Sequence, residues 1–159
     1  MHRLDRISRH INTQVERSLF VLGVLMIGVV AAQVFFRYVL NHSLFWSEEL
    51  ARYILVWLTF LGATAAYRRG AHPRIDLFAA RLGSRGARAL RVGAHLVAMA
   101  FCGVLVIYGA QFAYFVRLQI SPALQIPKWT VLLVLPFSGL VMCLHAAAAI
   151  ASELKESAS

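Results

Sequence analysis

Charged residues are absent from four long stretches of the chain, and this pattern indicates its architecture. The uncharged stretches cover residues 18–36, 53–67, 92–116 and 129–152. A bilayer core about 30 Å thick is crossed by roughly 20 helical residues and tolerates few ionised groups among them. Three of the stretches reach that length alone, so the pattern predicts transmembrane helices.

The second stretch needs a longer helix than its uncharged residues provide. At 1.5 Å per residue, residues 53–67 cover only about 22 Å. Their helix is therefore expected to begin earlier and to hold Glu48, Glu49 and Arg52 at the membrane edge. We expect an all-α integral membrane protein, with one four-helix domain over residues 1–159. Its four spans, in two antiparallel hairpins, are expected at about residues 18–37, 46–67, 92–116 and 129–152.

Two further segments have the spacing of short helices on the membrane surface. In residues 1–17 and in the middle connection 68–91, apolar residues recur at helical intervals among basic ones. An N-terminal signal peptide is the alternative for the first segment, but a span-length apolar stretch after a long charged lead favours an uncleaved anchor. In the middle connection, anionic lipid head groups are the expected contacts of Arg81, Arg85 and Arg88.

The composition excludes an ordinary soluble domain. Hydrophobic residues make up 60% of the chain and charged residues 14%, with a mean hydropathy of +0.68. The net charge of +9 does not indicate nucleic-acid binding here, because the basic residues flank the apolar stretches. Twelve of the 16 Lys and Arg lie in the two terminal segments and the middle connection, and four lie in the two hairpin loops. The positive-inside rule therefore places both termini in the cytoplasm.

The strongest polar cluster opens the second span and consists of Trp46, Ser47, Glu48, Glu49 and Arg52. Ser47 is placed to cap the helix, the acids suit the positive end of its dipole, and Glu48 and Arg52 have i,i+4 spacing. Capping needs only one acid, however, and a second carboxylate with an arginine at the membrane edge requires partners. A partner interface and simple helix capping both remain open for this cluster.

Two histidines and two cysteines offer other chemistry. His95 and His145 lie near the cytoplasmic ends of the third and fourth spans, where two facing histidines can ligate haem iron. Hydrogen bonds to neighbouring helices are the alternative for both. Cys102 and Cys143 lie in apolar stretches without metal-ligand spacing, so no metal site is expected. The chain has no nucleotide-binding loop and no nucleophile–base motif, so neither a cofactor nor an enzyme activity is expected.

The residues around the second span resemble a known family. The runs 36–52 and 57–63 are similar to the small membrane subunit of tripartite ATP-independent periplasmic (TRAP) transporters. The similarity continues in the following loop with Arg69, Gly70, His72, Ile75 and Asp76. It covers about residues 35–82, while the last two spans agree mainly in length and hydropathy. Pro73 stands where the family has an aliphatic residue.

The resemblance implies a small permease of the DctQ type in the bacterial inner membrane. Such a subunit supports a large multi-spanning permease, which holds the substrate and ion sites, and a periplasmic solute-binding protein delivers the substrate. The implied function is ion-gradient-driven uptake of an organic acid, for example a dicarboxylate. A haem-binding membrane anchor of a redox complex is the alternative function, and a stand-alone small exporter is a third.

The resemblance also suggests roles for individual residues. We expect a partner interface formed by Trp46, Glu48, Glu49, Arg52 and Trp57. The residues expected to order the cytoplasmic turn after the second span are Arg69, Gly70, His72 and Asp76. In that turn, Asp76 is expected to pair with Arg69 or Arg74 or to cap a short helix.

Overall fold

The computed structural model describes residues 2–69 and 84–156 of the chain. Over these residues it contains α1 (His2–Tyr38), α2 (Phe45–Arg68), α4 (Ser84–Phe115), α5 (Trp129–Leu132) and α6 (Val134–Glu156). Four segments are long and apolar enough to cross a membrane: Arg6–Tyr38, Phe45–Arg68, Gly86–Phe115 and Trp129–Ser152. The predicted all-α membrane fold with four spanning helices is therefore confirmed.

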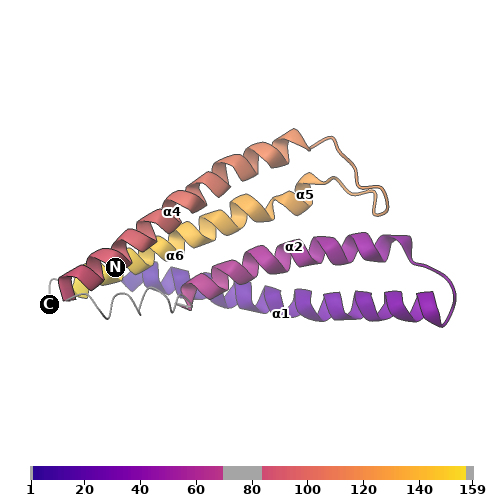
Figure 1. Ribbon diagram of the computed structural model, residues 1–159, viewed down its shortest axis with the longest axis horizontal. Coiled ribbons are helices and arrows are strands. Elements are labelled where there is room, and N and C mark those ends of the chain that lie inside the picture. The colour runs from indigo at the N-terminus through magenta and orange to yellow at the C-terminus, as the bar shows by residue number, and fades with distance from the viewer. Residues whose placement is uncertain (1, 70–83, 157–159) are drawn as a thin grey trace.

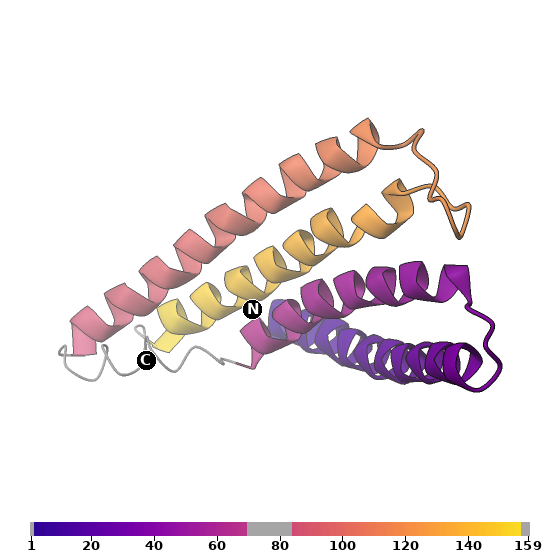
Figure 2. The ribbon, with the colours of Figure 1, turned by 45° about the vertical axis from the view of Figure 1, so that its right-hand side comes forward.

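The long helices lie side by side in the order α1, α2, α6, α4 (Figure 1, Figure 2). α1 packs along α2, α4 packs along α6, and contacts between α2 and α6 join the two pairs. The pairs spread apart toward loops 39–44 and 116–128, which we call the loop end (Figure 1). Both chain termini lie at the opposite end, which we call the terminal end (Figure 1).

α1 is a single helix of 37 residues that includes the basic N-terminal segment. The separate surface helix expected over residues 1–17 is not seen, because residues 2–17 continue directly into the span. Val15 is buried in a core cluster with Leu61 of α2 and Val134 of α6. The apolar spacing that suggested a surface helix therefore serves packing against two neighbouring helices. The helix expected in the middle connection lies in residues 70–83, outside the described residues.

A short break at Leu133 separates α5 from α6. Pro136 has no backbone N–H and cannot donate to the carbonyl of Leu132, four residues earlier, so the helical ladder is interrupted there. The ladder resumes where the N–H of Phe137 donates to the carbonyl of Leu133 at 3.1 Å. Together the two helices form the fourth candidate span.

Two glycines allow α4 and α6 to approach closely. A Cβ on Gly109 would lie 2.9 Å from the Cβ of Leu135, and one on Gly139 would lie 2.8 Å from Cγ2 of Val106. Small residues at such crossings let helix backbones pack tightly in membranes. A Cβ on Gly28 of α1, by contrast, would have no atom within 4 Å. Gly109 and Gly139 therefore both mark the close crossing of α4 and α6.

Candidate partner interface

The polar cluster of the second span lies in the first turns of α2, at the loop end. Leu44 occupies the N-cap position and makes no side-chain capping bond. Ser47 is not the cap, because the helix begins at Phe45; its hydroxyl instead donates to the carbonyl of Leu44 at 2.7 Å. Ser47 is fully buried. The expected capping role of Ser47 is therefore wrong.

Glu49 joins α2 to the loop between α4 and α5. One carboxylate oxygen, Oε2, accepts hydrogen bonds from the backbone N–H groups of Ala123 at 2.8 Å and Leu124 at 3.1 Å. The other oxygen, Oε1, accepts a hydrogen bond from the Tyr53 hydroxyl at 2.5 Å. Hydrogen bonds to an ionised carboxylate are roughly twice as strong as bonds between neutral groups. Glu49 therefore holds loop 116–128 against the start of α2.

Loop 116–128 is itself built around a tight turn. Ile120 and Pro127 pair across an isolated antiparallel bridge. The N–H of Ser121 donates to the carbonyl of Ile126 at 2.9 Å, and Gln125 adopts a left-handed φ of 54°. These bonds give the loop a defined shape beside α2.

Three members of the predicted interface remain on the surface. The Glu48 and Arg52 side chains are 74% and 68% exposed and form an i,i+4 ion pair, with 3.6 Å between Oε1 and Nη2. An exposed pair of this kind contributes little to stability. Trp46 is 42% exposed. These side chains are therefore accessible to a partner.

Trp57, the fifth predicted interface residue, is half-buried and packs against the core cluster. Glu49 is likewise engaged within the chain. Sequence reasoning did not identify their contacts, because no short-range spacing links residue 49 to the loop before α5. The structure thus separates two side chains with internal contacts from the three that lie on the surface.

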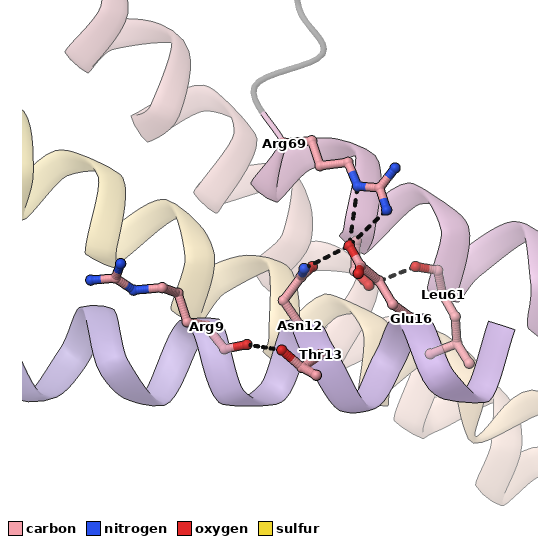
Figure 3. Close-up of polar contacts among 7 residues, drawn as sticks. Arg9, Asn12, Thr13, Glu16, Leu61 and Arg69 are labelled. Carbon is pink, nitrogen blue, oxygen red and sulfur yellow. Dashed lines mark hydrogen bonds and ion pairs between the residues drawn. The ribbon is translucent and has the colours of Figure 1, made fainter. Parts of the chain in front are cut away.

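At the terminal end, Arg69 pairs with a residue that sequence reasoning did not identify. Its Nε and Nη2 donate to Oε1 of Glu16 at 3.1 and 2.9 Å, and the Asn12 side chain donates to the same oxygen at 2.9 Å. Figure 3 shows Glu16 of α1 between these two partners. Arg69 thereby ties the end of α2 to α1. The other residues of the predicted turn lie outside the described residues: Gly70, His72 and Asp76.

The arginines expected at lipid head groups are described only in part. Arg81 and the side chain of Arg85 lie outside the described residues. Arg88 is half-buried in the first turns of α4. Contacts of these arginines with lipid stay a prediction.

The two histidines bond separately to hydroxyl groups of other helices. The Tyr67 hydroxyl of α2 lies 2.7 Å from His95 Nδ1, and the Ser8 hydroxyl of α1 lies 2.8 Å from His145 Nδ1. The His145 ring is enclosed by protein and only 1% exposed, which leaves it no open face toward a haem-sized group. These contacts fit interhelical hydrogen bonding.

The comparisons with known proteins agree with the helical architecture. The model of the family described as tripartite ATP-independent periplasmic transporters, DctQ component, matches residues 26–156. The C4-dicarboxylate TRAP transporter small permease protein DctQ of Rhodobacter capsulatus is 32% identical over 106 residues, which are 64% of this chain and 45% of that protein. The chain thus spans about half the length of that relative.

Two further relatives align over more of the chain. The ectoine TRAP transporter small permease protein TeaB of Halomonas elongata is 28% identical over 132 residues, 81% of this chain and 68% of that protein. The isethionate TRAP transporter permease protein DctMQ of Oleidesulfovibrio alaskensis is 27% identical over 135 residues, 77% of this chain and 21% of that protein. Because the family model covers most of the chain, this protein belongs to the DctQ family, the small permease components of tripartite ATP-independent periplasmic transporters, and is a transporter subunit rather than an enzyme.

Proposed function

We propose that the chain supports a large permease subunit in ion-gradient-driven uptake of an organic acid, for example a dicarboxylate, delivered by a periplasmic solute-binding protein. The names of the relatives support the transport of small organic solutes: a C4-dicarboxylate, ectoine and isethionate. The isethionate permease supports the pairing, because the segment similar to this chain is only 21% of that larger protein. The whole assembly is proposed to lie in a bacterial inner membrane.

The loop end is proposed to face the periplasm, with both termini in the cytoplasm. This orientation is supported by the distribution of basic residues, since only four of the 16 Lys and Arg lie in or near the two loops of the loop end: Arg37, Arg52, Arg117 and Lys128. Exposed aromatic residues near the loop end are those expected of an aromatic belt at one membrane interface: Tyr38, Trp46, Tyr114 and Trp129.

The loop-end surface is proposed to contact the large permease or the docked solute-binding protein. We define this surface as Trp46, Glu48, Arg52 and loop 116–128. The observation that carries the proposal is that Glu49 fixes the loop beside an exposed pair of opposite charges. A surface whose shape is set in advance loses less conformational entropy when a partner binds.

Charge reversal at Arg52 tests this contact. A tagged chain is extracted gently from native membranes, and the amount of co-purifying large permease and the rate of solute uptake are measured. Arg52→Glu is expected to lower one or both, because it places two carboxylates on the partner-facing turn of α2. Arg37→Glu, which reverses an exposed charge in the last turn of α1, is the matched control and is expected to change neither.

The double variant Glu48→Arg with Arg52→Glu separates a partner contact from the internal pair. It restores opposite charges one turn apart but inverts their positions. If the partner contacts each charge at its own position, partner binding is expected to remain impaired in the double variant. Full recovery in the double variant, or full activity of Arg52→Glu, would show that the cluster serves only α2.

A further inference from the structure

A groove between α1, α2 and α6 has chemistry that the proposed function does not use. Its volume is about 700 Å³, within the range of small-ligand pockets. One wall is a polar strip along one face of α1, formed by His10, Gln14, Arg17 and Ser18. The facing walls are apolar, with Trp57 and Leu61 from α2 and Phe137 and Val141 from α6.

The polar strip becomes apolar as α1 enters the membrane. Residues 10, 14, 17 and 21 recur at intervals of four, three and four, so they share one face of the helix. The strip therefore passes from His10, Gln14 and Arg17 to Val21, which also lines the groove. An occupant that fits this gradient has a charged or polar head and an apolar body.

Arg17 is the strongest recognition element of the strip. It is exposed, and in the part of the chain that the structure describes it makes no hydrogen bond or ion pair. The adjacent acid, Glu16, is held by Asn12 and Arg69 (Figure 3). A guanidinium beside membrane-spanning apolar walls needs an anion, and its planar donors match phosphate oxygens in pairs.

We propose that this groove binds an anionic glycerophospholipid such as phosphatidylglycerol. The phosphate pairs with Arg17, the polar strip toward His10 accommodates the rest of the head group, and an acyl chain lies along Val21, Leu22 and Trp57, on the loop-end side of Arg17. The excess of positive charge on this chain favours an anionic lipid over a zwitterionic one. A partner helix with an apolar face is disfavoured as the occupant, because it would leave the guanidinium of Arg17 without a counter-ion.

Trp57 provides a direct probe of the groove. Because the chain has three tryptophans, Trp46→Phe with Trp129→Phe leaves Trp57 as the single emitter. The full chain is reconstituted in vesicles in which brominated phosphatidylglycerol or brominated phosphatidylcholine quenches fluorescence. We expect half-maximal quenching at an about fivefold lower mole fraction of the brominated phosphatidylglycerol, as estimated for one basic contact near an anionic lipid.

Variants at Arg17 assign the preference to this residue. Arg17→Gln is expected to abolish the preference, whereas Arg17→Lys and the control Arg37→Gln are expected to keep most of it. Equal quenching by the two lipids, or a preference that survives Arg17→Gln, would overturn the proposal.

Native mass spectrometry of the chain purified with its permease tests whether the lipid persists in the complex. A phosphatidylglycerol adduct that Arg17→Gln removes supports the lipid site, and absence of the adduct would mean that protein covers the groove and would overturn the proposal. Uptake and permease co-purification do not depend on this result, so the lipid site and the proposed function can fail separately.

Discussion

The carboxylates of Glu48 and Glu49 have different tasks, although the two residues are neighbours in sequence. Successive residues of a helix point about 100° apart, so one side chain lies on the surface beside Arg52 and the other meets loop 116–128. Glu49 accepts three hydrogen bonds, and two of them come from backbone N–H groups, which a side-chain substitution in the loop would not remove. Removing the charge is therefore expected to affect the two positions unequally.

We predict that Glu49→Gln loosens loop 116–128 while Glu48→Gln does not. The amide keeps one acceptor oxygen but loses the charge that strengthens the bonds to Ala123 and Leu124. Arg117 and Lys128 are trypsin sites that flank the turn. Cleavage there in detergent-solubilised protein is expected to be about fivefold faster in Glu49→Gln than in the parent chain. Equal cleavage rates in both variants would contradict the role of Glu49.

The glycine crossing gives a second prediction at this scale. Gly139→Ala adds a methyl group where the nearest α4 atom is 2.8 Å away, and overpacking of this kind destabilises by about 1–3 kcal/mol. Gly103→Ala in α4 meets no atom within 4 Å and is expected to leave stability unchanged or to raise it by up to about 1 kcal/mol, because Ala is the better helix former. Unfolding free energies measured in the same detergent check both values. A neutral Gly139→Ala would show that the two helices separate easily.

At the scale of elements, two different contacts join α1 to α2. Val15 and Leu61 share a buried cluster, and Arg69 bonds Glu16 at the terminal end. The first contact is apolar and shielded, whereas the second is exposed and screened by salt. The apolar contact is therefore expected to dominate the stability of the pair.

A charge swap tests the exposed contact between these helices. Arg69→Glu and Glu16→Arg are each expected to lower the thermal midpoint slightly, by less than Gly139→Ala does. The double variant is expected to recover most of the loss at low ionic strength, because it restores opposite charges across the helix pair. Midpoints of all four proteins at low and high salt measure this coupling. If the double variant loses as much in thermal midpoint as the two single variants together, the contact depends on side-chain geometry and not on charge.

The sequence predicts the helices better than it predicts their contacts. Gaps between charges locate the four spans because the bilayer core excludes ions whatever the neighbours are. The N-terminal segment is harder, since apolar residues at helical spacing suit both a lipid surface and a protein neighbour. Burial of Ser8 depends on His145 in the last helix, which no local pattern encodes. The same holds at the candidate site, where Glu49 bonds backbone groups and Ser47 lies within the first turn of the helix that it was expected to cap.

At the scale of the whole molecule, the helix order leaves α1 and α4 as the two flanks. Large apolar side chains are exposed along both, for example Phe20 at 74% and Val97 at 72%. Such faces require lipid or a partner protein, which agrees with a subunit of a membrane complex. Both hairpin loops lie at one end of the molecule and both termini at the other (Figure 1). Finding which side of the membrane one end faces therefore gives the orientation of all four spans.

We predict opposite accessibility for the two ends of the molecule. In a Cys102→Ala, Cys143→Ala background, an impermeant maleimide is expected to label Gln119→Cys in intact cells. Thr13→Cys, in the exposed part of the N-terminal segment, is expected to react only after the inner membrane is permeabilised. Labelling of Thr13→Cys in intact cells would invert the proposed orientation.

The position of α6 between α2 and α4 also has a consequence for biogenesis. Val15 and Leu61 complete their cluster with Val134, and Ser8 bonds His145, so helices made first depend on residues made last. While α1 and α2 enter the bilayer during translation, these side chains have no protein cover from the second hairpin. In a ribosome-bound intermediate, the side chains of α1 and α2 that α6 later covers are therefore exposed to insertases and quality-control proteases until α6 emerges. Mutations in the final helix are then expected to shorten the lifetime of the newborn protein before they affect transport.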